Sequence, residues 1–156
     1  GTMIDQAVAD FSLPATGGKA FQLSAARGGP LVIYFYPKDN TPGCTTEAGQ
    51  FRDLHDQFAR LGCAVFGVSR DSLKSHENFK AKLGLPFELL VDAEEVACEI
   101  FGVIKQKKLY GKLVRGIERS TFLIDGQGVL RQEWRGVKAD GHAAEVLQAV
   151  AAMQDR

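Results

Sequence analysis

The feature that most constrains the fold is an apolar run that stops abruptly at a proline. Residues 31–36 read Leu-Val-Ile-Tyr-Phe-Tyr and directly follow the sequence Gly-Gly-Pro. This run predicts a β-strand covered on both faces, because a half-exposed strand would alternate apolar and polar residues. Pro37 has no backbone N–H to donate to a sheet, so the strand is expected to end there.

A turn and then a helix are predicted directly after this strand. Residues 38–43 are rich in turn-forming residues. Residues 44–61 carry apolar side chains at spacings of three and four, which predicts a helix. Those side chains are Phe51, Leu54, Phe58 and Leu61. Cys44 is therefore expected at or near the N-terminus of a helix, with Glu47 in the first turn.

The expected place of Cys44 indicates nucleophilic chemistry. Unpaired backbone N–H groups and the positive end of the helix dipole favour a thiolate over a thiol. The structural alternative is a small buried apolar residue, which is the usual role of a free cysteine. The spacing of Pro37, Thr41 and Cys44 directly after a buried strand favours the nucleophile.

The remaining segments predict an α/β fold. Residues 63–69 form a second buried strand, which completes a β-α-β unit with parallel strands and a right-handed crossover. Ser72 caps a further helix, residues 87–91 form a short strand, and Asp92 begins another helix. Such a pattern predicts a central sheet with helices on both faces.

Two hairpins and a terminal helix complete the predicted fold. Residues 11–23 contain two short segments in which apolar and polar residues alternate, separated by a glycine-rich turn. Residues 120–124 and 129–134 flank the turn sequence Asp-Gly-Gln-Gly, which also predicts a hairpin. The last helix is expected over about residues 141–153. The lysine-rich residues 105–116 are interpreted as a solvated loop rather than a nucleic-acid-binding patch.

Length and charge limit the class of protein. The chain has 156 residues, 45% of them hydrophobic, and 19 basic side chains balance 19 acidic ones. One domain over residues 3–156 is expected, with no bulk charge to attract nucleic acid or an anionic membrane. Residues 1–2 precede Met3 and look like a cloning scar. A cytoplasmic location is expected, because no apolar run reaches the roughly 20 residues that span a bilayer and no signal-peptide pattern appears.

The cysteines and histidines predict neither a disulfide framework nor a metal site. Cys44, Cys63 and Cys98 are widely spaced, and no Cys-x-x-Cys occurs. Cys63 opens a predicted buried strand and is expected in the core. His55 and His76 are interpreted as helix-face residues rather than ligands, so no metal, haem or flavin is implied.

Pro37, Thr41 and Cys44 match the Pro-x-x-x-Thr/Ser-x-x-Cys signature of peroxiredoxins. The chain resembles their Q-type subfamily, also called bacterioferritin comigratory protein, over Phe-Tyr-Pro-Lys-Asp-Asn-Thr-Pro-Gly-Cys-Thr-Thr-Glu. The similarity continues through residues 67–76 and 110–122 and covers nearly the whole chain. This resemblance implies a thioredoxin-like fold with a central mixed sheet, and an antioxidant enzyme that reduces hydrogen peroxide and organic hydroperoxides without a cofactor.

The resemblance also implies roles for single residues. The Cys44 thiolate is expected to attack a peroxide oxygen and become a sulfenic acid. Thr41 and Arg119 are expected to stabilise the developing negative charge, and Glu47 to orient Arg119 through a charge-assisted pair. From the sequence alone, Arg119 would be interpreted as a surface arginine at a strand end. The residues expected to shape the pocket are Tyr36, Pro37, Pro42 and Gly43, with Asn40 and Arg135 as further members.

The chain departs from the family at the positions of the resolving cysteine. Gly49 stands five residues after Cys44, and Lys80 follows His-Glu-Asn-Phe, where many members carry that cysteine. A one-cysteine cycle is therefore expected, in which thioredoxin, glutaredoxin or a small thiol reduces the sulfenic acid directly. Cys98, in a predicted helix, is the alternative resolving residue.

Two other functions compete with a peroxidase that acts as a monomer or weak dimer. A peroxide sensor or relay would pass the oxidation of Cys44 to a partner protein and would not sustain peroxide consumption. A structural or chaperone-like thioredoxin-fold module would function equally well as Cys44→Ser. The helix-start cysteine with Thr41 and Arg119 argues against that module.

Overall fold

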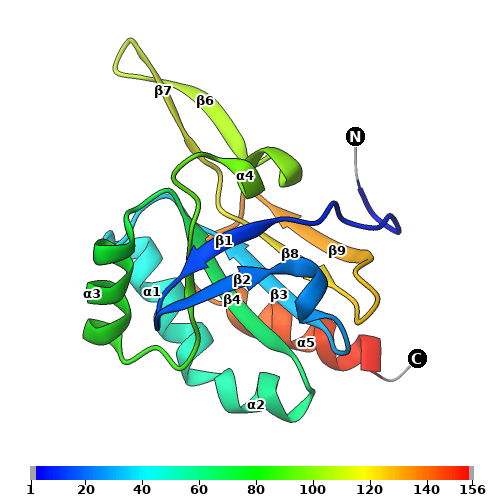
Figure 1. The fold of residues 1–156 in the computed structure, drawn as a ribbon. Helices are drawn as coiled ribbons and strands as arrows, with labels where there is room; N and C mark the ends of the chain where they lie inside the picture. The colour runs from blue at the N-terminus through cyan, green and yellow to red at the C-terminus, as the bar shows by residue number, and fades with distance from the viewer. Residues whose placement is uncertain (1–2, 155–156) are drawn as a thin grey trace.

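The computed structural model describes residues 3–154, so the suspected cloning scar at residues 1–2 lies outside the described residues. A seven-stranded mixed sheet with the order β2-β1-β5-β4-β3-β8-β9 forms the centre of the fold (Figure 1). Its strands are β1 (Ser12–Ala15), β2 (Lys19–Gln22), β3 (Leu31–Phe35), β4 (Ala64–Ser69), β5 (Leu89–Val91), β8 (Ser120–Ile124) and β9 (Leu130–Arg135). Because β3 pairs in parallel with β4 and antiparallel with β8, it lies inside the sheet.

The β3 strand is buried on both faces, as its continuous apolar sequence predicts. Leu31, Ile33 and Phe35 belong to a core cluster on one face, and Val32 and Tyr34 belong to a second cluster on the other. All five residues are at most 2% exposed. The sheet therefore separates two cores, and the side of a residue relative to β3 decides which neighbours it meets.

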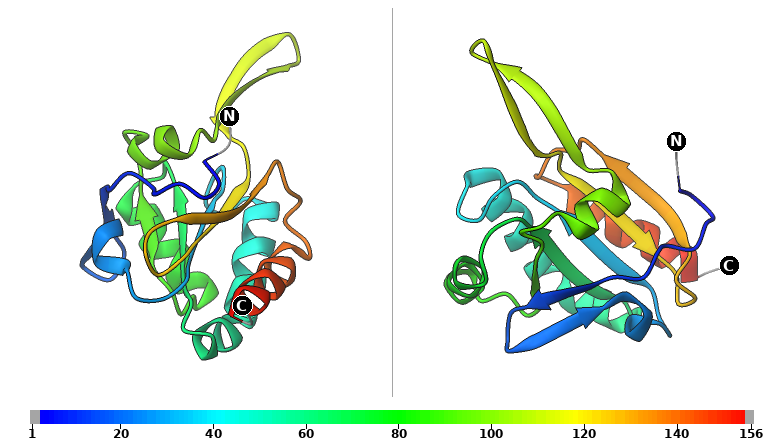
Figure 2. Two further views of the ribbon diagram at one scale, coloured as in Figure 1. Left: turned by 90° about the vertical axis from the view of Figure 1, so that its right-hand side faces the viewer. Right: turned by 45° about the horizontal axis from the view of Figure 1, so that its top comes forward.

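Helices cover both faces of the sheet, which confirms the predicted mixed sheet flanked by helices (Figure 2). The Tyr34 side packs against α1 (Pro42–Asp53), α2 (His55–Arg60), α3 (Leu73–Leu83) and α5 (His142–Gln154). The other side packs against α4 (Val96–Phe101) and the short 3-10 helix η1 (Leu23–Ala26). Within residues 3–154, no helix is both long enough and apolar enough to cross a membrane.

The single helix predicted over residues 44–61 is wrong, because α1 and α2 meet at a break. Leu54 adopts φ −98° and ψ 0°, and its N–H bonds to the carbonyls of Gln50 and Arg52. Phe51 and Phe58 are nevertheless both buried, with ring centroids 5.8 Å apart. The break preserves the apolar spacing, so periodicity alone does not reveal it.

The helix predicted to begin at Asp92 begins instead at Val96. Residues 92–95 form a turn closed by a 3.1 Å bond from the N–H of Glu95 to the carbonyl of Asp92. Glu95 has a left-handed backbone with φ 62°. The carboxylate of Asp92 accepts a 2.8 Å bond from the N–H of Cys98, inside the first turn of α4. A left-handed glutamate has no signature in the sequence, since this conformation favours glycine or asparagine.

The solvated loop predicted over residues 105–116 is in fact an antiparallel hairpin of β6 (Ile104–Leu109) and β7 (Lys112–Ile117). It forms a separate two-stranded sheet that projects from the body of the molecule (Figures 1 and 2). Its side chains are exposed on both faces over most of its length. Because neither face is buried, the sequence lacks the apolar alternation by which strands are usually recognised.

Candidate active site

Cys44 lies in the first turn of α1 and is only 2% exposed. Thr41 is the extended N-cap residue and Pro42 opens the helix. The first backbone bond across this turn runs from the N–H of Thr45 to the carbonyl of Thr41, at 2.9 Å. The N–H groups of Gly43 and Cys44 precede that bond and belong to the helix terminus, where a negative charge is stabilised. The helix-start position predicted for Cys44 is therefore the one it occupies.

Arg119 reaches Cys44 from the neighbouring strand. It directly precedes β8, whose first residue, Ser120, pairs with Phe35 at the end of β3. Its Nη2 lies 3.5 Å from the Sγ of Cys44, and its Nη1 donates to Oε1 of Glu47 at 2.6 Å. Cys44 and Glu47 stand three residues apart on α1, which places both on the side that faces Arg119. One guanidinium thus contacts the thiol and the carboxylate together.

The Glu47–Arg119 ion pair is largely withdrawn from solvent. The Glu47 side chain is fully buried and the Arg119 side chain is 15% exposed. Burial raises the pKa of Glu47 to about 7, although the charge and hydrogen bond of Arg119 oppose this rise. Burial also acts to lower the pKa of Arg119, but the charges of Glu47 and Cys44 outweigh it and raise that pKa. Arg119 therefore stays cationic beside the sulfur.

Gly43 makes room for this arginine. A Cβ atom at position 43 would lie 3.0 Å from Nη2 of Arg119. That separation is shorter than an ordinary van der Waals contact, so any side chain would push the guanidinium away from Cys44. The glycine expected to shape the site therefore acts through the space it leaves empty.

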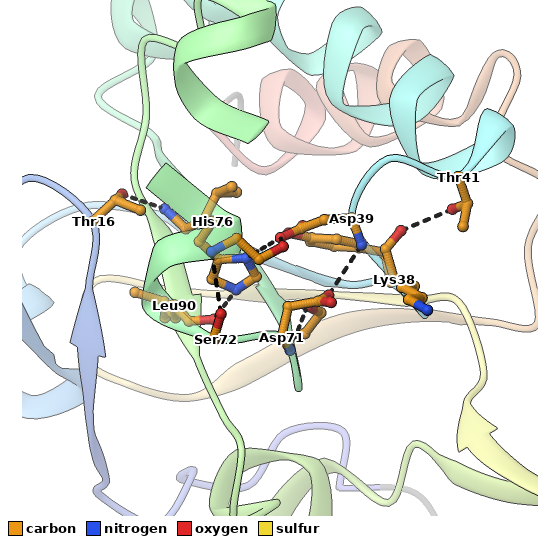
Figure 3. A network of polar contacts seen from close by, with 12 residues as sticks. Thr16, Lys38, Asp39, Thr41, Asp71, Ser72, His76 and Leu90 are labelled. Carbon is orange, nitrogen blue, oxygen red and sulfur yellow. Dashed lines mark hydrogen bonds and ion pairs between the residues drawn. The ribbon is translucent and has the colours of Figure 1, made fainter. Parts of the chain in front are cut away.

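The loop between β3 and α1 is held by a polar network (Figure 3). The Thr41 hydroxyl donates to the carbonyl of Lys38 at 2.8 Å. The N–H of Asp39 donates to Oδ2 of Asp71 at 3.0 Å, which ties the loop to the end of β4. Tyr36 is 1% exposed, and its hydroxyl donates to Oδ1 of Asp39 at 2.6 Å. Tyr36 thus lies beneath the loop and supports it.

His76 of α3 anchors the same loop from the protein interior (Figure 3). It is fully buried, with Nδ1 2.7 Å from Oδ2 of Asp39 and Nε2 2.8 Å from the carbonyl oxygen of Leu90. The two contacts use both ring nitrogens, so His76 ties the loop to β5. Burial alone would raise the pKa of Asp39, but hydrogen bonds from His76 and Tyr36 outweigh it and hold that pKa below its usual value.

Sequence reasoning missed this network. His76 is a helix-face residue, as interpreted, but it lies on the buried face of α3 together with Phe79. The sequence marks Asp39 only as one of the turn-forming residues 38–43, and nothing in it links Asp39 to His76, 37 residues later. Among the described residues, Asp39, Asp71 and His76 bring potential metal-ligand atoms within 4.8 Å of one another. Asp39 bonds to His76, and the other contacts of these atoms are with neighbouring hydroxyl, carbonyl and N–H groups, which is the arrangement of a satisfied polar cluster.

Of the remaining residues predicted to shape the pocket, three are exposed at the surface and one lies on the other face of the sheet. Pro37 is exposed and lines a pocket of about 220 Å³ together with residues of the β6–β7 hairpin. Pro42 is exposed at the start of α1, and Asn40 is an exposed loop residue with φ 65°. Arg135 does not join the site. Its guanidinium lies over the ring of Phe122, on the other face of the sheet from Cys44.

The other two cysteines are buried and lie away from Cys44. All three thiols are free. Cys63 is 4% exposed on the same side of the sheet, as predicted for a core residue, and burial raises its pKa to about 12. Cys98 is fully buried on the opposite side, where burial raises its pKa far above the usual value.

The comparisons with known proteins agree with this geometry. The sequence matches the model of the AhpC/TSA family over residues 4–133. Peroxiredoxin Bcp of Bacillus subtilis is 51% identical over 153 residues, which cover 98% of this chain and 98% of the relative. Peroxiredoxin Bcp of Xanthomonas campestris is 53% identical over 143 residues, which cover 92% of this chain and 89% of the relative.

Solved structures give the same result. The bacterioferritin comigratory protein of Xanthomonas campestris, studied for its alkyl peroxide reduction activity, superposes with a TM-score of 0.89 at 51% identity. That match covers 92% of each chain. The peroxidoxin BcpB of Mycobacterium tuberculosis superposes with a TM-score of 0.86 at 34% identity, over 98% of this chain and 99% of the other.

Proposed function

This chain belongs to the AhpC/TSA family of peroxiredoxins, in its Q-type group, and is a thiol-dependent peroxidase; we propose that Cys44 is the residue that peroxide oxidises. The observation that supports this assignment most directly is the Arg119 guanidinium, which contacts the Cys44 sulfur and the Glu47 carboxylate together. Cys44 and Cys98 both lie in the first turn of a helix, but Cys98 has the carboxylate of Asp92 on its N–H, whereas Cys44 has the guanidinium of Arg119 beside its sulfur. A helix N-terminus and a neighbouring guanidinium both stabilise a thiolate.

The proposed reaction transfers one oxygen atom from peroxide to sulfur. The Cys44 thiolate attacks the nearer peroxide oxygen, so that an S–O bond forms while the O–O bond breaks. The farther oxygen leaves as water or an alcohol after gaining a proton. Negative charge moves from sulfur onto the oxygens during this step, and a fixed cation beside the sulfur stabilises it without rearranging. Arg119 is the group placed to do this, and Glu47 fixes its orientation.

Thr41 is proposed to position the peroxide. Its hydroxyl proton is directed to the carbonyl of Lys38, which leaves the oxygen lone pairs available to accept a hydrogen bond from the substrate. The N–H groups of Gly43 and Cys44 are proposed to donate to the peroxide oxygens. Both hydrogen peroxide and organic hydroperoxides fit this scheme, since only the O–O group takes part.

We propose that recycling follows a one-cysteine route. An external thiol attacks the sulfenic sulfur and releases water, and a second thiol then reduces the mixed disulfide to restore Cys44. The positions of the other cysteines support this route. Cys98 lies across the sheet from Cys44, and a disulfide needs Cα atoms within about 7 Å. The proposed reductant is thioredoxin, with glutaredoxin or a small thiol as alternatives.

Steady-state peroxide consumption by cysteine variants tests this proposal. With dithiothreitol or with thioredoxin as reductant, Cys44→Ser should abolish turnover, whereas Cys63→Ser and Cys98→Ser should retain it. A Cys98→Ser variant that consumes one equivalent of peroxide but no longer turns over would refute the one-cysteine route. Full activity of Cys44→Ser would refute the assignment of Cys44 itself.

A further inference from the structure

The β6–β7 hairpin, residues 104–117, gathers exposed apolar side chains that nothing in the molecule covers. Six large apolar residues are well exposed in the described part of the chain. They are Leu73, Val96, Leu109, Tyr110, Leu113 and Val114, and the last four belong to the hairpin. Tyr110, at the tip, is 96% exposed. A concentration of apolar surface on one projecting element is typical of an interaction site.

The same hairpin concentrates positive charge. Its 14 residues contain five of the 19 basic residues and none of the 19 acidic ones. Arg115 pairs with Glu95 and fixes the base of the hairpin to the body. The four lysines are exposed, and within residues 3–154 none of them forms an ion pair; they are Lys105, Lys107, Lys108 and Lys112. The balanced charge of the chain thus hides a strongly cationic element, which favours an anionic partner.

Apolar and cationic side chains occur on both faces of the hairpin. Successive residues of a strand point to opposite faces, and Leu109 pairs with Lys112 while Lys108 pairs with Leu113. One face carries Lys105, Lys107, Leu109, Lys112 and Val114, and the other carries Lys108 and Leu113. A protein docked on one face would leave the apolar residues of the other face in water. A lipid interface surrounds an inserted tip on every side and covers both.

The turn at the hairpin tip contains a tyrosine, Tyr110, in a backbone conformation that disfavours bulky residues. Tyr110 and Gly111 connect the strands with φ values of 52° and 79°, as in a type I′ turn. Such turns favour Asn-Gly, and a bulky residue in the left-handed region costs stability. Tyr110 also buries almost no surface within the molecule. An aromatic ring with a polar hydroxyl is well suited to the boundary between lipid headgroups and hydrocarbon.

We propose that the hairpin tip docks on the surface of an anionic lipid bilayer. Leu109, Tyr110 and Leu113 would enter the interfacial region, and the four lysines would face the headgroup phosphates. A second copy of the chain fits less well, because paired hairpins would bring like charges together. The balanced charge of the whole chain predicts no contact with a membrane. The hairpin differs from the chain as a whole, because its five basic residues have no acidic residue beside them in the hairpin.

Vesicle flotation with the full chain tests the proposal. The protein should float with vesicles of phosphatidylcholine and phosphatidylglycerol, and much less with phosphatidylcholine alone. Salt on the order of 1 M should release it, since the Debye length then falls to about 3 Å. The assay measures binding only, so its result does not depend on the peroxidase chemistry proposed for Cys44.

The double variant Tyr110→Asn with Leu113→Ser separates docking from folding. It creates the favoured Asn-Gly turn, so the hairpin should be at least as well formed, while binding should weaken about tenfold from the lost apolar area. The matched control is Leu73→Ser with Val96→Ser, which removes two side chains that are each 43% exposed elsewhere. This control should bind like the parent chain. Peroxide consumption without vesicles should be unchanged in the hairpin variant.

A second pair of variants tests the charge. Lys107→Gln with Lys112→Gln should weaken binding to anionic vesicles about tenfold or more, because each lysine near the surface contributes to attraction. Lys74→Gln with Lys82→Gln removes the same charge from exposed positions on α3 and should have little effect.

Three results would overturn the proposal. In the first, the parent chain does not bind anionic vesicles. In the second, the hairpin variant and its control lose binding equally. In the third, the chain associates with itself but does not bind vesicles. The third result, if sedimentation velocity shows that the hairpin variant abolishes it, would assign the hairpin to contact between copies instead.

Discussion

At the scale of single residues, the site depends on contacts between residues that are far apart in the sequence. Arg119 comes from the start of β8 and contacts the sulfur, whereas Glu47 comes from α1 and holds Arg119. His76 comes from α3 and holds Asp39, in the loop that carries Thr41. The contacts of Arg119 with Cys44 and Glu47 and that of His76 with Asp39 join residues at least 37 positions apart, so the fold and not the local sequence assembles the site.

Arg119→Lys should slow the reaction of Cys44 with peroxide about 100-fold, because lysine keeps the charge but loses the planar fork that contacts sulfur and carboxylate together. Stopped-flow oxidation of the reduced protein measures this rate. Arg52→Lys, on the same helix as Cys44 but paired with Asp53, is the control and should react like the parent chain. An unchanged rate in Arg119→Lys would remove the guanidinium from the mechanism.

The buried Glu47 should make stability fall as pH rises. Between its ordinary pKa of 4.5 and its folded value of about 7, the folded protein keeps a proton that the unfolded chain releases. The free energy of unfolding should therefore decrease across this window, by at most about 3 kcal/mol, and stay level above it.

Glu47→Gln isolates this effect, because glutamine does not titrate. The free energy of unfolding of the parent chain minus that of Glu47→Gln should decrease from about pH 4.5 to about pH 7 in denaturant titrations. If this difference instead increases with pH, the ion pair with Arg119 outweighs burial and the pKa of Glu47 lies below its ordinary value.

His76→Gln should destabilise the protein by about 3 kcal/mol, since it removes the 2.7 Å contact of the imidazole with the buried Asp39 carboxylate. It should also reduce the peroxide reaction rate by displacing the loop of Thr41. Thermal unfolding and stopped-flow oxidation measure the two effects, with the half-buried His55→Gln as control. If stability falls and the reaction rate of the folded protein does not, the network supports the fold without positioning the loop.

At the scale of elements, β3 and its neighbour β4 determine how closely the active-site helix packs. A Cβ atom at Gly67 of β4 would lie 2.8 Å from the Tyr34 ring and 2.9 Å from Leu89. Tyr34 is fully buried and stacks on Phe51 of α1, with centroids 4.5 Å apart. The glycine thus allows the aromatic stack on which α1 rests.

Gly67→Ala should accordingly destabilise the protein by about 1–3 kcal/mol through overpacking. Gly49→Ala should instead stabilise the protein. That residue lies within α1, its Cβ would be 3.5 Å from Arg52, and alanine is the better helix former by up to about 1 kcal/mol. Denaturant titration of both variants checks the contrast. Equal effects of the two substitutions would contradict this account of the packing.

The sequence predicts an element well where a continuous local pattern of residues specifies it. The β3 strand follows from its apolar run, and the start of α1 follows from the proline, turn residues and apolar spacing. The break at Leu54 and the turn before α4 are not predictable from pattern, because each depends on backbone geometry that leaves the apolar spacing intact. The β6–β7 hairpin is not predicted because its side chains are exposed on both faces over most of its length.

The candidate site is predicted only in part, for the same reason. Cys44, Thr41 and Glu47 are recognisable because they lie in one continuous segment. Arg119 is assigned through family resemblance alone, since its proximity to Cys44 arises from the pairing of β8 with β3. The pairing of Asp39 with His76 depends on how α3 packs on the sheet, which no local pattern specifies.

At the scale of the whole molecule, the sheet keeps the three thiols apart. Cys98 lies on the opposite face from Cys44. Cys63 shares the face of Cys44 but precedes β4, whose first residue pairs with Leu31 at the beginning of β3, whereas Cys44 follows the end of β3. That strand alone separates its ends by roughly 15 Å, well beyond disulfide range. An oxidised Cys44 is therefore expected to wait for an external thiol.

The most direct test is the intact mass of the reduced protein after one equivalent of hydrogen peroxide, without added thiol. We predict the gain of one oxygen atom, trapped at Cys44 by a sulfenic-acid reagent. The loss of two hydrogens within one chain would mean an internal disulfide and would contradict the one-cysteine account. Oxygen gained at Cys63 or Cys98 with Cys44 unchanged would contradict the site itself.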